Sequence, residues 1–345
     1  EEFHTQWARN DEDLALPRGA VLSERFEISR NFCTKLWNAS RFTLMNLSGY
    51  EAAEVAEEDL AFEDRWILSR LASVTQQVTE KLEHYGFAEA TRVLYDFAWD
   101  EFCSFYIEMT KSRMQDDSSR AVAQRVTAYT LDQLLRLLHP IIPFVTEEVW
   151  GLLSQIAPER GLSELAVATE SIMLAQWPVA DGARIHVEIE QQFSQFQEVL
   201  RAVREIRSRQ NIAPRDEIEF SIHCSAADEQ LLRPLEGYFE SMANARCVAW
   251  GESVETPENS ASVRVGEMEV FVDLKDFIDV DAEIERNTAL EQKLLGQIQG
   301  RQKKLANEQF TARAPAEIVE RERAGLVQLE EELAAVRKSL EALQA

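Results

Sequence analysis

Residues 28–47 read ISRNFCTKLWNASRFTLMNL, and this stretch decides the fold of the first part of the chain. An apolar or small residue recurs every three or four positions, which is the period of one face of a helix. That face comprises Phe32, Leu36, Ala39 and Thr43, and Trp37 is expected to belong to the core as well. The stretch therefore predicts a helix that buries one side against neighbouring elements.

The same period continues through the next hundred residues. A second helix is expected over residues 60–84, with Gly86 as its left-handed terminator. A third, rich in aromatic residues, covers about 90–109. Ser118 or Ser119 is expected to cap a fourth, which Pro140 ends, and Pro143 can open a fifth. Long helices with short connections predict a helical bundle over residues 28–156.

The pattern changes beyond the bundle. Periodicity fades over residues 157–182, which are expected to form a linker. Residues 183–280 then predict a small α/β subdomain. They contain a helix that stops before Pro214, an alternating strand from Ile218 to Cys224, a helix near 231–242, and short strands near 247–250, 263–265 and 268–274.

Residues 281–345 show a heptad pattern. Leucine and valine recur at spacings of three, four and seven from Val319 to Leu343, and Ile284, Leu295, Ile298 and Leu305 precede them. Pro315 lies between the two runs and cannot continue a helix. The segment predicts an antiparallel two-helix coiled coil on the order of 40 Å long. The expected fold class is thus mainly α, with one small α/β subdomain.

Charge is unevenly distributed. The formal net charge of −25 opposes binding to nucleic acid, yet three stretches are locally basic. These are residues 28–47, the run from Arg201 to Arg215, and the run from Lys293 to Arg313. Basic helix faces are common, but this pattern is also compatible with a defined track for a polyanion.

The sequence offers no catalytic centre and no metal site. It has no glycine-rich phosphate loop, and its five histidines are isolated from one another. His139 before Pro140 is expected to be structural, and the Glu147-Glu148 pair to interact with a helix dipole. Four dispersed cysteines are typical of reduced thiols in a cytoplasmic protein, and there is no long apolar run or leader that would indicate a membrane or secretion.

Five motifs resemble valyl-tRNA synthetases, and their order along the chain is that of the family. Residues 30–42 (RNFCTKLWNASRF) resemble the opening of the anticodon-binding bundle. Residues 64–71 (DRWILSRL), 94–103 (LYDFAWDEFC) and 139–150 (HPIIPFVTEEVW) are similar to later helices of that bundle. Residues 304–315 (KLANEQFTARAP) are similar to the tip of the family's coiled-coil arm. The resemblance covers roughly residues 28–345.

The resemblance implies two tRNA-binding surfaces. The bundle would read the anticodon, and the candidates there are Arg30, Asn31, Lys35, Asn38 and Arg41. The coiled coil would lie against the outer corner, or elbow, of the tRNA, and the candidates there are Lys293, Arg301, Lys303, Lys304, Phe310 and Arg313. For each residue the alternative is ordinary helix polarity, and Phe310 could equally plug the turn.

The resemblance also implies partners and limits. Family members ligate valine to tRNA-Val with ATP and Mg²⁺, but their HIGH and KMSKS motifs are absent here, so this chain should be inactive by itself and hold no cofactor. Residues 1–27, which begin with Glu1, read as an irregular lead-in from a truncated catalytic part. The expected partners are tRNA-Val and the upstream catalytic and editing domains, in a monomer. A free-standing tRNA-binding module is the alternative, whereas a coiled-coil scaffold would explain only residues 281–345.

Overall fold

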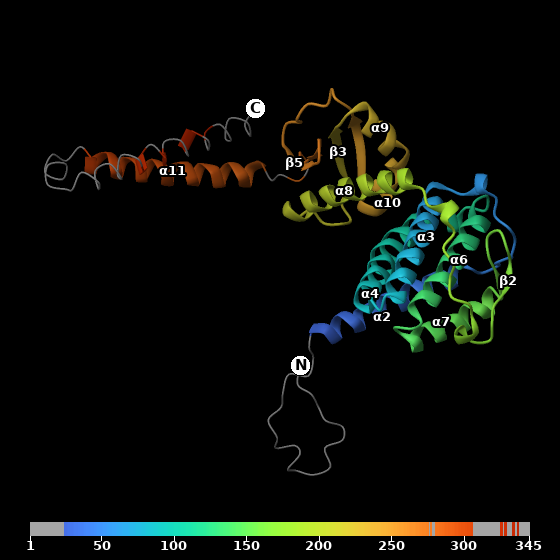
Figure 1. Cartoon of the computed structure of the whole chain (residues 1–345). Helices are drawn as coiled ribbons and strands as arrows, with labels where there is room; N and C mark the ends of the chain where they lie inside the picture. Colours follow the sequence, from blue (N-terminus) through green and yellow to red (C-terminus); the bar gives the residue numbers. More distant parts are fainter. Residues whose placement is uncertain are drawn as a thin grey trace, which may run out of the picture.

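The structure is a computed structural model that describes residues 24–275, 277 and 280–305, and in the C-terminal segment residues 325, 326, 328, 329, 333, 334 and 337. It is mainly helical with a small mixed sheet (Figure 1). The predictions for residues 1–23 and for Phe310, Arg313 and Pro315 lie outside the described residues, whereas residues 24–27, which were expected to be irregular, are helical. Within the described part, no helix is long and apolar enough to cross a membrane.

The first part is a bundle of helices that lie side by side (Figure 1). Its main helices are α2 (Glu24–Asn46), α3 (Phe62–Glu83), α4 (Phe87–Asp96), α6 (Arg120–Leu138) and α7 (Pro143–Ile156). The predicted inner face of α2 is confirmed, because Phe32, Leu36, Ala39 and Thr43 are buried. The expectation for Trp37 is wrong: its side chain is 38% exposed, since it lies on the opposite side of the helix.

The helix ends were predicted less accurately than the helices. Pro143 is the first residue of α7, as expected. Gly86 is not left-handed; Tyr85 takes that conformation, with φ of 59°. The Gly86 N–H donates to the Lys81 carbonyl at 2.7 Å and the Tyr85 N–H to that of Leu82 at 3.0 Å. This is the two-bond closure of a Schellman motif, which places the left-handed residue one position earlier than the glycine.

The third predicted helix contains an irregularity that its sequence did not reveal. After α4 the chain winds as a π-helix, η2 (Phe97–Tyr106), and then as α5 (Ile107–Thr110). The wider turn still directs Phe97, Phe102 and Tyr106 into the core. The Ser104 hydroxyl donates to the carbonyl of Trp99, five residues back, at 2.8 Å. π-segments often occur at functional places, so the side chains beside η2 are relevant below.

The connection after α7 is not a free linker. It forms a two-stranded hairpin, β1 (Glu159–Arg160) with β2 (Ala166–Val167), and Ala157, Arg160, Leu162 and Ile172 are buried. Fading periodicity in this segment therefore reflects irregular packing against the bundle. The boundaries predicted for the separate domains stay predictions.

A four-stranded mixed sheet follows. Its strands are β3 (Ile218–His223), β4 (Ala245–Trp250), β5 (Ser260–Val265) and β6 (Met268–Asp273). The helices of this part of the chain are α8 (Val187–Arg209), α9 (Ala226–Leu232), η6 (Arg233–Leu235) and α10 (Glu236–Ala243). The strand order is β4-β3-β6-β5, with β3 and β4 parallel and the other pairs antiparallel. The helix predicted near 231–242 is thus three shorter helical elements, with Pro234 in the middle one.

The bundle and the sheet share one hydrophobic core. Trp66 of α3 stacks on Phe193 of α8 with ring centroids 3.7 Å apart. Phe196 of the same helix continues to Phe239 of α10, at 4.8 Å. Because α8 is packed against both parts, it holds the sheet in a fixed position beside the bundle.

Helix α11 (Val280–Leu305) follows the sheet. Leu294 and Ile298 form a small buried cluster with Leu333, bordered by Leu295, Leu326 and Leu329. Glu291 forms an ion pair with Arg337 at 2.6 Å. The sheet and helices α8 and α10 lie between the bundle and α11 (Figure 1).

Candidate RNA-binding surface

The outer face of α2 carries the residues predicted from the first basic stretch. Arg30, Asn31, Asn38 and Arg41 are exposed. With about 100° of rotation per residue, Asn31 and Asn38 lie on one line along the helix, and Arg30 and Arg41 lie together at its border. Among the described residues none forms an ion pair with Arg41, and Arg30 has only a 3.9 Å contact with Glu27. The structure thus presents four of the five candidates on one accessible face.

Lys35 differs from the other four. Its ammonium donates to the Ser104 hydroxyl at 2.6 Å and lies 4.0 Å from the centroid of the Trp99 ring. Burial lowers the pKa of Lys35, while Cys103 and Asp100 act in the opposite direction. The side chain is therefore engaged with the π-helix, and it holds η2 against α2 rather than extending freely from the surface.

Trp37 was missed as a candidate of this face. On the helix it lies beside Arg30 and Arg41, and its ring is 38% exposed. Unstacked RNA bases commonly bind to aromatic rings and to guanidinium planes. A helical wheel of residues 28–47 contains the signal, since Trp37 falls within about 40° of both arginines and away from Phe32 and Leu36.

The candidates on α11 are only partly grouped. Lys293, Lys303 and Lys304 are exposed, and Arg301 is half-buried. Lys293 and Lys304 lie on the same side of α11. Arg301 lies nearer to the apolar cluster that contains Ile298, and Lys303 lies on neither of these two sides of the helix. The Arg301 guanidinium packs over Gly325.

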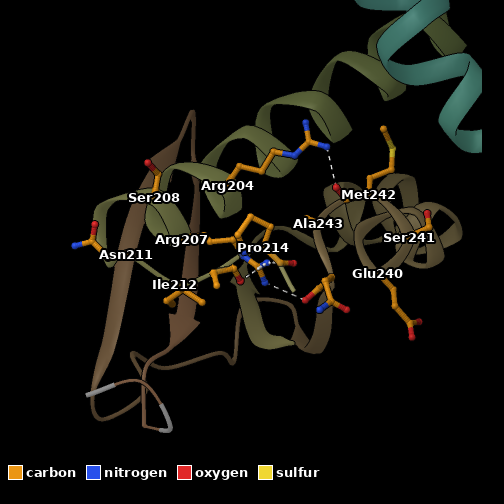
Figure 2. A pocket seen from close by; sticks show the side chains of 12 residues that line it. Arg204, Arg207, Ser208, Asn211, Ile212, Pro214, Glu240, Ser241, Met242 and Ala243 are labelled. Atoms are coloured by element: carbon orange, nitrogen blue, oxygen red, sulfur yellow. Dashed lines mark hydrogen bonds between the residues drawn. The ribbon is translucent and has the colours of Figure 1, made fainter. Parts of the chain in front are cut away.

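A third basic place lies along α8. Arg204 and Arg207 line an open groove of about 770 Å³ between α8 and α10 (Figure 2). The Arg204 guanidinium donates to the Met242 carbonyl at 2.9 Å. Arg207 is buried and donates to the carbonyls of Ala213, Pro214, Asp216 and Asn244. The basic run from Arg201 to Arg215 is thus divided between a structural arginine and exposed ones.

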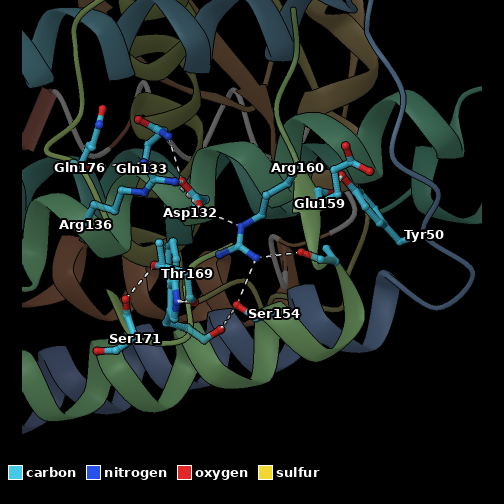
Figure 3. Close-up of polar contacts among 12 residues, drawn as sticks. Tyr50, Asp132, Gln133, Arg136, Ser154, Glu159, Arg160, Thr169, Ser171 and Gln176 are labelled. Carbon is cyan, nitrogen blue, oxygen red and sulfur yellow. Dashed lines mark hydrogen bonds and ion pairs between the residues drawn. The ribbon is translucent and has the colours of Figure 1, made fainter. Parts of the chain in front are cut away.

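Another cluster of arginines has a structural role inside the protein. Arg160 pairs with Asp132 at 2.6 Å, and Arg136 pairs with the same carboxylate at 2.9 Å (Figure 3). The Arg160 guanidinium also lies 4.3 Å from the centroid of the Trp150 ring. Arg160 and Asp132 are almost fully buried, so this cluster fastens the β1 hairpin to α6 and α7.

A second buried network joins the bundle to the sheet. Arg113 contacts Glu63 at 2.8 Å and Asp64 at 2.7 Å, and the Tyr238 hydroxyl of α10 donates to Glu63 at 2.6 Å. Burial raises the pKa of Asp64 to about 6, although Arg113 opposes the shift. The network has no open access for a substrate, and its chemistry is that of a structural tie.

The residues with possible catalytic chemistry are also structural. All four cysteines, which lie in described parts of the chain, are free thiols. Burial raises the pKa of Cys103 to about 12. His139 Nδ1 lies 2.8 Å from the Thr146 hydroxyl, and Glu147 accepts a hydrogen bond from Ser171 at 3.0 Å. The His139 and Glu147 side chains are thus used within the bundle.

Comparison with known proteins gives a consistent result. Residues 64–222 match the family described as anticodon-binding domain of tRNA ligase, and residues 279–344 match the valyl tRNA synthetase tRNA binding arm. The chain is 52% identical over 344 residues to a valine–tRNA ligase of Rhodopirellula baltica, covering 99% of this chain and 33% of that protein. The chain belongs to the valine–tRNA ligase family and corresponds to the C-terminal part of its members.

Other relatives give the same coverage. Valine–tRNA ligases of Syntrophotalea carbinolica and Carboxydothermus hydrogenoformans are 37% and 38% identical, over 92% and 87% of this chain and 35% and 33% of their own lengths. The chain therefore spans about a third of the length of the curated relatives it matches. The match to the anticodon-binding domain of tRNA ligase extends through α8 into β3, so it includes Arg204 and Arg207.

Proposed function

We propose that this chain is the tRNA-Val-binding part of a ligase that joins valine to tRNA-Val with ATP and Mg²⁺. The catalytic and editing parts would precede it in the full enzyme. The observation that carries the proposal is the exposed α2 face, which combines two arginines, two amides and one indole. Such a combination is suited to single-stranded bases, which bind by stacking and by hydrogen bonds to their edges.

Within this proposal the α2 side chains have different roles. Trp37, flanked by Arg30 and Arg41, offers a stacking surface for an anticodon base. Asn31 and Asn38 can both donate and accept hydrogen bonds, as base edges require. Lys35 positions η2 through Ser104, so its effect on RNA would be indirect.

We propose further that α11 and the segment after it form an antiparallel coiled coil that contacts the tRNA elbow. The buried cluster of Leu294, Ile298 and Leu333 supports this pairing, and so does the Glu291–Arg337 ion pair. Lys293 and Lys304 would contact phosphates from one side of the arm. Phe310 and Arg313 belong to the same proposal from the family resemblance alone.

Equilibrium binding of fluorescent tRNA-Val to the purified chain tests the function. We expect salt-sensitive binding that is tighter than for an unrelated tRNA, and no valine-dependent pyrophosphate exchange. Trp37→Ala should raise Kd by roughly 5- to 150-fold, because a base stacked on an aromatic ring contributes about 1–3 kcal/mol. Arg233→Gln is the control, since Arg233 lies on η6 and pairs with Glu229 at 2.8 Å. Equal affinity for unrelated tRNA would contradict the proposal.

A further inference from the structure

Two arginines of α8, the exposed Arg204 and the buried Arg207, lack the carboxylate partners that Arg70 and Arg113 have. Arg70 pairs with Glu101 and Glu190, and Arg113 with Glu63 and Asp64. Arg204 and Arg207, in contrast, donate only to backbone carbonyls among their described hydrogen bonds. A cation that is partly removed from water without a carboxylate partner favours an anionic ligand nearby.

The state of each arginine agrees with this reasoning. Arg207 is 93% buried, and its Nε is a buried donor without a hydrogen-bond partner. Arg204 is exposed and bonds the Met242 carbonyl through Nη2 alone among the described contacts, which leaves its Nε and Nη1 available. Desolvation lowers the pKa of both guanidinium groups, and the charges of Glu108 and Asp216 respectively act in the opposite direction.

The groove beside them is suited to a charged ligand. It measures about 770 Å³, within the range of ligand-sized clefts. Ser208, Asn211 and Ser241 line it with neutral donors, and Figure 2 shows these side chains on both sides of the opening. Glu240 is the acidic residue of the lining, and in Figure 2 its carboxylate points away from Arg204.

We propose that the α8–α10 groove binds a phosphodiester of the RNA backbone, with Arg204 as the direct contact and Arg207 as the buried charge behind it. The inference rests on the proposed tRNA-binding function and adds a third contact to it. Its location supports RNA over other anions. The groove belongs to the part that lies between the bundle and α11 (Figure 1), and an RNA that contacts both would run alongside this part. A backbone contact there would orient the RNA without reading its sequence.

The test measures the Kd of the full chain for tRNA-Val over a series of salt concentrations. Arg204→Gln should raise Kd about three- to tenfold and reduce the slope of log K against log salt by about 1, as the loss of one phosphate contact predicts. Arg204→Lys keeps the charge and should retain most of the slope. Arg233→Gln removes an arginine from the same subdomain outside the groove, and should change neither quantity.

A second pair of variants avoids any loss of native bonds. Ser208→Glu places a carboxylate in the groove, whereas Ser253→Glu places one in the exposed loop after β4. Both change the net charge equally, and we expect only Ser208→Glu to weaken binding. Circular dichroism of each variant confirms folding. If wild-type chain binds tRNA-Val but the groove variants behave like their controls, the groove inference is wrong. Failure of the wild type to bind would instead reject the proposed function itself.

Discussion

Removing Arg160 should destabilise the bundle through the carboxylate it leaves behind. In the native structure the Asp132 carboxylate is 2% exposed and pairs with Arg160 at 2.6 Å and with Arg136 at 2.9 Å. Arg160 also donates to the Ala157 carbonyl at 2.8 Å and covers the Trp150 ring (Figure 3). Arg160→Met retains most of the apolar volume of the side chain but removes the charge.

The expected loss of stability depends on the partners that Asp132 keeps after Arg160 is replaced. Breaking a buried ion pair by removing one partner costs about 3–5 kcal/mol. Arg136 and the Gln133 amide both remain on Asp132, which places the cost near the lower end. The freed Ala157 carbonyl adds about 1 kcal/mol. We therefore expect Arg160→Met to lower the free energy of unfolding by about 3–4 kcal/mol.

Urea unfolding monitored by circular dichroism measures this change. The same substitution in an Asp132→Asn background should cost only about 1 kcal/mol, because no buried carboxylate then loses an ion-pair partner. Arg233→Met is the matched control. Its side chain is 61% exposed, and a surface pair contributes at most about 1 kcal/mol. A cost for Arg160→Met below about 1 kcal/mol, or an equal cost in both backgrounds, would refute the reasoning.

Three further outcomes are expected. Because burial raises the pKa of Asp64 to about 6, above the ordinary value of 3.8, the native state binds the proton more tightly than the unfolded state does. Stability should therefore fall as pH rises from about 4 to 6, and Asp64→Asn should flatten this part of a plot of urea midpoint against pH. Lys35→Gln should lower the free energy of unfolding by about 1–2 kcal/mol through its lost contacts with Ser104 and Trp99, whereas Arg41→Gln should change it by less than about 0.5 kcal/mol in the same urea assay. Tyr85→Gly should stabilise the chain by about 0.5–1 kcal/mol, since Tyr85 is 81% exposed with φ of 59°; an unchanged urea midpoint would contradict the assigned strain.

The sequence predicted what depends on neighbours along the chain. The helical period of apolar residues suffices to predict α2, and the alternation of apolar and polar residues suffices to predict β3, because each pattern is complete within a short stretch of sequence. The π-helix was not predictable in this way, since residues 97–106 keep apolar side chains at spacings that an α-helix also permits. The parallel pairing of β3 with β4 depends on where α10 returns the chain.

The exposure of the candidate site residues was predicted in part for the same reason. Four of the five α2 candidates are exposed as expected, because the helix period alone determines which side they occupy. The function of Lys35 depends on Ser104, 69 residues away, and that of Arg160 on Asp132, 28 residues away. Contacts at such separations arise only from the tertiary fold, so the basic residues used internally could not be told from the accessible ones.

This division of the basic residues explains how an acidic chain can serve as an RNA-binding one. Arg70, Arg113 and Arg160 are neutralised inside the protein, so they contribute little attraction to a distant polyanion. With a net charge of −25, the molecule as a whole repels RNA. At physiological ionic strength that repulsion is screened beyond about 8 Å, whereas a stacked base or a contacted phosphate is closer than this. On the binding proposed above, an RNA that meets the α2 face, the groove and the arm together would gain contacts that offset this repulsion, whereas a non-specific RNA would not.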